Sequence, residues 1–69
     1  MNKHIKETIR IVGGQTKLAD ALDVTQPFIS LVLNEVKQVP AAFCMKIQHI
    51  TEGEITAIDL RPDIFSPIE

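Results

Sequence analysis

Residues 15–34 constrain the fold of this chain more than any other stretch, because they contain two short apolar stripes separated by a tight turn. Both stripes have the i, i+3, i+4 spacing of one helix face. Their members are Leu18, Ala19 and Leu22 in the first stripe and Ile29, Val32 and Leu33 in the second. Asp23-Val24-Thr25 interrupts the pattern, and we expect Val24 to be buried at the corner. The spacing predicts a helix-turn-helix unit whose second helix faces outward.

Helical signals also surround this unit. Asn2 is a suitable N-cap for a helix from about Lys3 to Val12. Gly13-Gly14 ends that helix, because glycine readily adopts the left-handed conformation found at helix C-termini. The two helices of the unit itself are predicted over residues 15–22 and about 26–34.

Proline residues mark the starts of the third and fourth helices. Pro27 stands in the first turn of the third helix, after Thr25 as the N-cap, where its missing N–H costs little. Pro40 opens a fourth helix that runs to about Ile50. The expected core stripe of this fourth helix consists of Phe43, Ile47 and Ile50.

The segment 54–60 fits two structures. Thr56 and Asp59 are spaced as a capping box for a short fifth helix that Pro62 would end. The β-branched residues of this segment suit a strand equally well. We favour the helix because the chain offers no second clear strand as a pairing partner. The expected fold is therefore all-α, with four or five helices in one compact domain over residues 1–65, followed by a disordered tail at 66–69.

The residues of the helix-turn-helix unit resemble those of a known family. The pattern Gln-Thr-Lys-x-Ala from Gln15, followed by Leu22-x-Val24, Gln26 and Ile29, is similar to the operator-binding unit of the Cro repressors of temperate phages. The rest of the chain resembles the small prophage-encoded Cro/YdaS-type regulators, especially in Val39-Pro40-Ala41 and in residues 60–65. This resemblance implies a lambda-repressor-like, Cro-like fold and a regulator that binds double-stranded operator DNA.

The resemblance and the helix geometry indicate which side chains face the bases. In such a unit the second helix enters the major groove with its N-terminal residues against base edges. The candidates are Gln26, Pro27, Ser30 and Leu31. The Gln26 amide can pair with N6 and N7 of adenine. Pro27 and Leu31 depart from the Cro pattern, since Pro27 replaces a small polar residue and Leu31 stands where a basic residue is expected. Leu31 can pack on a thymine methyl group, take part in a dimer contact or simply be an exposed leucine.

A second set of residues is suited to phosphate oxygens. The candidates are Gln15, Thr16, Lys17, Thr25, Asn34 and Lys37. The first three begin a helix, where unpaired N–H groups and the helix dipole favour an anion and the lysine adds a positive charge. The other three lie at the ends of the recognition helix or just beyond it.

The charge of the chain is uneven. Its formal net charge is −2, but residues 1–50 contain six Lys or Arg against four Asp or Glu, whereas residues 51–69 contain one against five. The local field determines attraction to DNA more than the total charge does. A basic front half with an acidic C-terminal part is therefore compatible with a nucleic-acid partner.

The small size of the chain favours dimerisation. With 69 residues it is near the lower limit for folding without additional stabilisation. Cys44 is the single cysteine, so a disulfide framework is excluded, and we expect this residue in the core. A dimer adds stability and suits a symmetric operator. The candidate dimer contacts are Ile64 and Phe65, which would pack on a partner subunit or on the first helix.

No combination of residues suggests catalysis. His4 and His49 are far apart, and no Ser-His-Asp set, paired catalytic carboxylates or glycine-rich phosphate loop can be assembled. We expect no enzyme, no cofactor, no metal and no small-molecule substrate. The chain shows neither a signal peptide nor an apolar run long enough for a membrane span, so we expect a cytoplasmic protein without a membrane partner.

Two functions remain open from the sequence. The first is a sequence-specific transcriptional regulator, a Cro-like prophage repressor that binds a pseudo-palindromic operator as a homodimer through residues 26–34. The alternative is a protein-interaction module or antitoxin-like regulator that uses the same helical fold. Its expected surface consists of Leu31, Ile64, Phe65 and Ile68.

Overall fold

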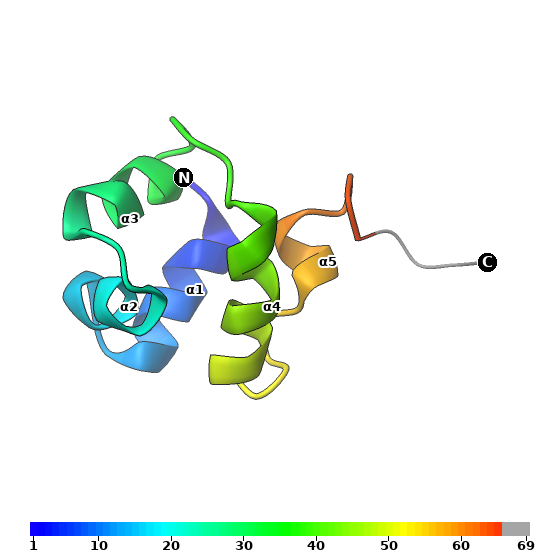
Figure 1. The fold of residues 1–69 in the computed structure, drawn as a ribbon, viewed down its shortest axis with the longest axis horizontal. Helices are drawn as coiled ribbons and strands as arrows, with labels where there is room; N and C mark the ends of the chain where they lie inside the picture. The colour runs from blue at the N-terminus through cyan, green and yellow to red at the C-terminus, as the bar shows by residue number, and fades with distance from the viewer. Residues whose placement is uncertain (66–69) are drawn as a thin grey trace.

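The computed structural model describes residues 1–65, and all regular secondary structure in this part of the chain is helical (Figure 1). The helices are α1 (Lys3–Val12), α2 (Gln15–Leu22), α3 (Gln26–Leu33), α4 (Ala41–Ile50) and α5 (Ala57–Leu60). The predicted all-α fold is confirmed, as are the bounds of the first two helices. The third helix ends one residue earlier than expected, and the fourth begins after Pro40 rather than at it. The predicted tail at 66–69 lies outside the described residues.

One apolar cluster holds the helices together. α1, α2 and α3 form one side of the molecule, α4 crosses its middle, and α5 lies on the opposite side (Figure 1). Both predicted stripes of the helix-turn-helix unit are buried in the cluster. Its buried members are Ile5, Leu18, Ala19, Leu22, Ile29, Val32, Leu33, Val39, Cys44, Ile47, Ile55, Ala57 and Leu60.

The inward face of α4 differs from the predicted stripe. Cys44 and Ile47 are fully buried, whereas Phe43 and Ile50 are only half-buried. For Phe43, the reason lies in its aromatic contact with α3. The ring of Phe43 packs edge-on against Phe28, with ring centroids 6.0 Å apart, and this pair occupies the periphery of the core. The expected core position of Cys44 is confirmed.

The ends of α1 and α2 explain the tight connections between the first three helices. The Asn2 side chain accepts hydrogen bonds from the N–H groups of His4 and Ile5, both at 3.1 Å, which confirms the predicted N-cap. Gly13 ends α1 with a φ of 102°, a conformation that glycine adopts without strain. Asp23 ends α2 in the left-handed region with a φ of 58°, where aspartate is tolerated.

Two details of the turn differ from expectation. Val24 is half-buried rather than buried, although it packs against the core. Its N–H donates to the carbonyl of Ala19 (2.9 Å), so the backbone as well as the side chain fixes the corner. Thr25 occupies the N-cap position of α3, but its side chain makes no capping hydrogen bond. The hydroxyl group of Thr25 is therefore not used in starting the helix.

The ambiguous segment 54–60 forms a helix only in its second half. Thr56 and Asp59 form the predicted capping box, and α5 begins at Ala57, so the strand alternative is wrong. These hydrogen bonds to Thr56 lower the pKa of Asp59. Before α5, the buried Thr51 hydroxyl donates to the Ile47 carbonyl (2.7 Å) and accepts from the Ile55 N–H (3.2 Å). This bridge connects α4 to the turn that leads into α5. No helix within residues 1–65 has the length and apolar character required to span a membrane.

Candidate nucleic-acid interface

The first residues of α2 and α3 contact each other. The Gln26 side chain donates a hydrogen bond from Nε2 to Oε1 of Gln15, at 2.5 Å. Each glutamine is the first residue of its helix, so the N-termini of α2 and α3 lie together on one side of the unit. The sequence predicted separate roles for the two glutamines, and the structure brings them together as a pair.

The contact between the glutamines leaves Gln26 suited to adenine. A primary amide has two N–H donors and one carbonyl acceptor. Gln15 takes one donor, so the second N–H and the carbonyl oxygen remain available. Adenine presents an acceptor at N7 and a donor at N6 in the major groove, which is the complementary pair. The hydrogen bond to Gln15 therefore restrains the amide without consuming the N–H and the carbonyl oxygen that are complementary to adenine.

The other base-contact candidates share the outward face of α3. Gln26 and Pro27 are exposed, Ser30 is half-buried, and Leu31 is 37% exposed. The opposite face of α3 is buried against the rest of the domain. Asn34 follows this outward face, but its side-chain N–H donates to the Ser30 carbonyl (3.0 Å). This bond, together with a longer one to the Ser30 hydroxyl (3.4 Å), directs the Asn34 amide toward its own helix.

The start of α2 combines features that attract an anion. The N-cap residue of α2 is Gly14, which has no side chain to cap the helix. The first N–H groups of α2 therefore make no capping bond to an N-cap side chain and can donate to an anion. Thr16 and Lys17 are exposed beside this helix end. The stem of Lys17 lies across Gly13, where an added Cβ would come within 3.2 Å of Lys17 Cδ. The lysine charge is therefore held near the N-terminus of α2.

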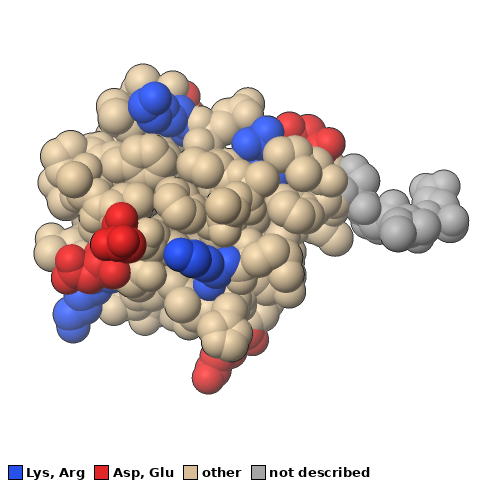
Figure 2. Space-filling model, in the orientation of Figure 1, with Lys and Arg blue, Asp and Glu red and all other residues tan. Residues whose placement is uncertain are grey.

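The charged side chains are distributed over the surface without forming a single basic patch on the visible face. Figure 2 shows lysine and arginine side chains on that face separated from one another by neutral and acidic residues. Attraction to phosphates then depends on a few cations placed beside the helices. Lys17 and Lys37 are the sequence-predicted candidates among them.

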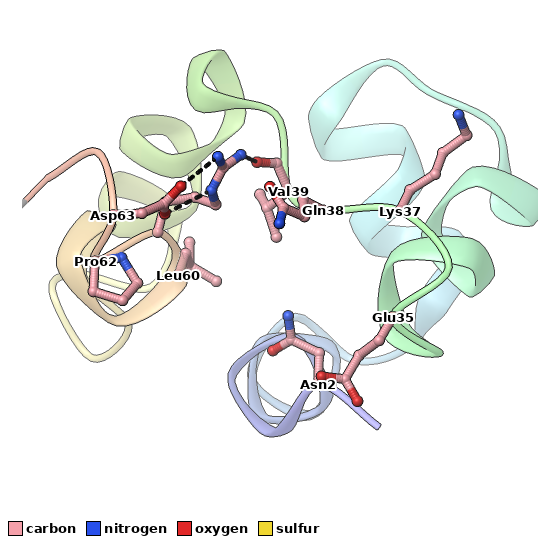
Figure 3. A pocket seen from close by; sticks show the side chains of 9 residues that line it. Asn2, Glu35, Lys37, Gln38, Val39, Leu60, Pro62 and Asp63 are labelled. Carbon is pink, nitrogen blue, oxygen red and sulfur yellow. Dashed lines mark hydrogen bonds and ion pairs between the residues drawn. The ribbon is translucent and has the colours of Figure 1, made fainter.

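Lys37 lies in the connector between α3 and α4, which spans residues 34–40. Its side chain is exposed and extends away from Asn2 and Leu60 (Figure 3). The backbone N–H groups of Val36 and Lys37 both donate to the Leu31 carbonyl, at 2.9 and 3.2 Å. The end of α3 therefore fixes the position from which the lysine side chain extends.

The two candidate dimer contacts differ in burial. Ile64 is 49% exposed, whereas Phe65 is half-buried and packs against the core of its own chain. Ile64 is therefore the more accessible of the pair for a second subunit.

Sequence reasoning missed Arg61, whose guanidinium donates to the Val39 carbonyl (2.9 Å) and to the Asp63 carboxylate. The spacing of Arg61 and Asp63 was the available signal, but the contact with Val39 has no local sequence pattern.

Two kinds of comparison with known sequences gave matches. Residues 5–69 match the family model described as bacterial toxin YdaS. A protein of Escherichia coli (strain K12) named as the transcriptional regulator YdaS is 38% identical over 63 residues, which cover 91% of this chain and 64% of the relative. The chain thus spans slightly less than two thirds of that relative's length. A second protein of the same strain, named as a prophage transcriptional regulatory protein, is 37% identical over 51 residues, covering 74% of this chain and 77% of its own.

A solved structure has nearly the same fold. The Cro protein from the prophage element Xfaso 1 in Xylella fastidiosa strain Ann-1 superimposes with a TM-score of 0.85 and is 36% identical in sequence. The match covers 97% of this chain and 100% of the Cro chain. The agreement therefore extends over all the described helices, including the segment around α5 that the sequence left ambiguous.

Proposed function

This chain belongs to the YdaS family of Cro-like prophage regulators, and we propose that it represses transcription by binding a pseudo-palindromic operator as a dimer. The resemblance to Cro that the sequence suggested is confirmed, and the chain is a Cro-like regulator. In the proposed complex, the outward face of α3 lies in the major groove and the N-terminus of α2 lies against a phosphate. Occupying the promoter then excludes RNA polymerase.

The contact between Gln15 and Gln26 carries this proposal. It aligns a base-reading amide with the anion-attracting start of α2. We propose Gln26, Pro27, Ser30 and Leu31 as base contacts, and Gln15, Thr16, Lys17, Thr25, Asn34 and Lys37 as phosphate contacts.

The dimeric operator makes a geometric prediction. Selection of high-affinity duplexes from a random library with the purified protein is expected to yield two inverted half-sites. Their centres should be about 10 base pairs, or one helical turn, apart, because two recognition helices related by a two-fold axis enter successive major grooves on one face of DNA. Recovery of a single, non-repeated half-site would contradict binding as a dimer.

The dimer contact makes a prediction of its own. Ile64→Ser is expected to weaken self-association by about 10-fold or more while leaving the melting temperature of the monomer nearly unchanged, because Ile64 is 49% exposed. Phe65→Ala should lower both properties, since its ring also packs on the core. Sedimentation and thermal melting measure the two effects. Ile58→Ser is the matched control, with an isoleucine that is 41% exposed on α5. If Ile64→Ser and Phe65→Ala leave self-association unchanged, or if Ile58→Ser weakens it equally, the dimer contact lies elsewhere.

A protein-interaction role is the second candidate, and exposed apolar side chains favour it. Leu31 and Ile64 both present apolar surface to solvent. Phe65, expected to join them, is partly used by the core, and Ile68 lies outside the described residues. A stable 1:1 complex with the product of a neighbouring gene, formed by a protein without DNA affinity, would support this candidate over the repressor.

A further inference from the structure

Arg61 bridges two parts of the molecule that lie apart in sequence. Its Nη1 donates to the Val39 carbonyl at 2.9 Å, while Nε and Nη2 donate to the two Asp63 carboxylate oxygens at 3.0 and 2.8 Å (Figure 3). The Arg61 side chain is only 18% exposed. A planar guanidinium can donate two parallel hydrogen bonds to a carboxylate and a third hydrogen bond to a carbonyl. The ammonium group of lysine cannot reproduce this geometry.

The Val39 end of this bridge belongs to the connector that leaves the recognition helix. Val39 is buried in the core, but the residues before it, from 34 to 38, are all exposed. A cavity of about 330 Å³ separates this connector from the C-terminal turn, with lining that includes Asn2, Gln38 and Leu60 (Figure 3). Side chains do not fill this space, and the Arg61 hydrogen bond to the Val39 carbonyl joins its two sides.

The other end of the bridge is firmly anchored. The Arg61 N–H donates to the Ala57 carbonyl (2.9 Å), and the Arg61 carbonyl accepts from Ile64 and Phe65, at 3.0 and 2.9 Å. The half-buried Phe65 ring holds the same turn against the core. Pairing with Arg61 also lowers the pKa of Asp63, so that carboxylate is charged at neutral pH and keeps the guanidinium in place.

We propose that Arg61 is a positioning residue for DNA reading, because its guanidinium holds the connector after α3 against the C-terminal turn. Its hold on Val39 supports the hydrogen bonds of Val36 and Lys37 to the Leu31 carbonyl, which keep the last turn of α3 and the origin of Lys37 in place. This inference rests on the proposed function of α3. It also connects the proposed dimer contact to DNA binding, because Arg61 links the turn that contains Ile64 to the connector that follows α3.

Three variants of the full chain test this role. Arg61→Met removes the guanidinium group from a side chain of similar length. Arg61→Lys keeps the positive charge but not the planar guanidinium. Arg10→Met is the matched control, because Arg10 forms an exposed ion pair with Glu7 on α1 and its loss costs the same charge. The first measurement is amide hydrogen exchange of Val36 and Lys37 in the free protein. The second is the affinity for the selected operator and for a scrambled duplex, at a temperature well below the melting transition.

The expected results separate positioning from general stability and from charge. In Arg61→Met, exchange at Val36 and Lys37 should accelerate about 10-fold relative to amides inside α2, since local opening of the connector becomes easier. Operator affinity should fall about 10-fold, with affinity for scrambled DNA within about 2-fold, because phosphate attraction is not what is lost. Arg61→Lys should behave like Arg61→Met, and Arg10→Met like the unsubstituted protein.

Other outcomes overturn specific parts of the account. Unchanged exchange at Val36 and Lys37, or unchanged operator affinity, would overturn the positioning role. Full recovery in Arg61→Lys, or an equal loss in Arg10→Met, would overturn it in favour of a simple charge effect. If the unsubstituted protein does not prefer the operator, the proposed function itself fails, and the exchange data then show independently whether Arg61 holds the connector.

Discussion

Replacing Gln26 with alanine is expected to lower operator affinity by about 5- to 150-fold for each half-site, the equivalent of the 1–3 kcal/mol carried by a bidentate amide–adenine pair, and the losses at the two half-sites of a dimer multiply. The slope of affinity against salt concentration should not change, because no charge is removed. Fluorescence anisotropy measures both quantities. Gln38→Ala is the matched control, since Gln38 is an exposed glutamine in the connector. Equal affinities for the Gln26→Ala variant and the unsubstituted protein would remove Gln26 from the base contacts.

The same experiment extends to Gln15, because the two glutamines form one unit. Gln15→Ala removes the acceptor that restrains the Gln26 amide. In a double-mutant cycle we expect Gln26→Ala to cost less in the Gln15→Ala background, with a coupling energy on the order of 1 kcal/mol. Strictly additive effects would mean that each glutamine contacts DNA independently.

Truncation of Leu18 should have the largest effect on folding. Leu18 is fully buried in α2, and Leu18→Ala is expected to lower the free energy of unfolding by about 2–5 kcal/mol. A chain of this length has a total free energy of unfolding on the order of 3–10 kcal/mol, so the variant should lose a large fraction of its stability. A fall of about 8–40 °C in melting temperature is the measurable result.

The Leu18 prediction has a control in the neighbouring helix. Leu31→Ala makes the same chemical change at a residue that is 37% exposed, and it should cost less than about 1 kcal/mol. A similar loss of stability in both variants would show that burial in the helix-turn-helix core does not determine the effect. Leu18→Ala should also lose operator binding in proportion to its unfolded fraction, and recover it at low temperature.

The parts of the fold that could be predicted are those controlled by local sequence. Asn2, Gly13 and the pair of Thr56 and Asp59 are capping signals that act over a few residues, and they place the helix ends where the structure has them. The stripes of the helix-turn-helix unit follow from helix periodicity alone. The face of α4 did not follow from it, because the edge-on packing of Phe43 on Phe28 decides which residues turn inward.

The candidate site was predictable as a set of positions but not as an arrangement. Helix periodicity places Gln26, Ser30 and Leu31 on one face, and the structure agrees that this face is outward. Two contacts between distant residues were out of reach: Gln15 with Gln26, and Arg61 with Val39. Such hydrogen bonds depend on how the helices pack, and no short pattern in the sequence encodes them.

The most direct test of the repressor account is a fluorescence anisotropy titration of the purified protein into DNA from upstream of its own gene, at several salt concentrations. We predict saturable binding that exceeds binding to a scrambled duplex by at least about 1,000-fold. With Lys17 and Lys37 of two protomers contacting about four phosphates, the affinity should fall roughly 100-fold between 50 and 200 mM salt. Weak binding that is indifferent to sequence would contradict the account and leave the helix-turn-helix unit as a scaffold for a protein partner.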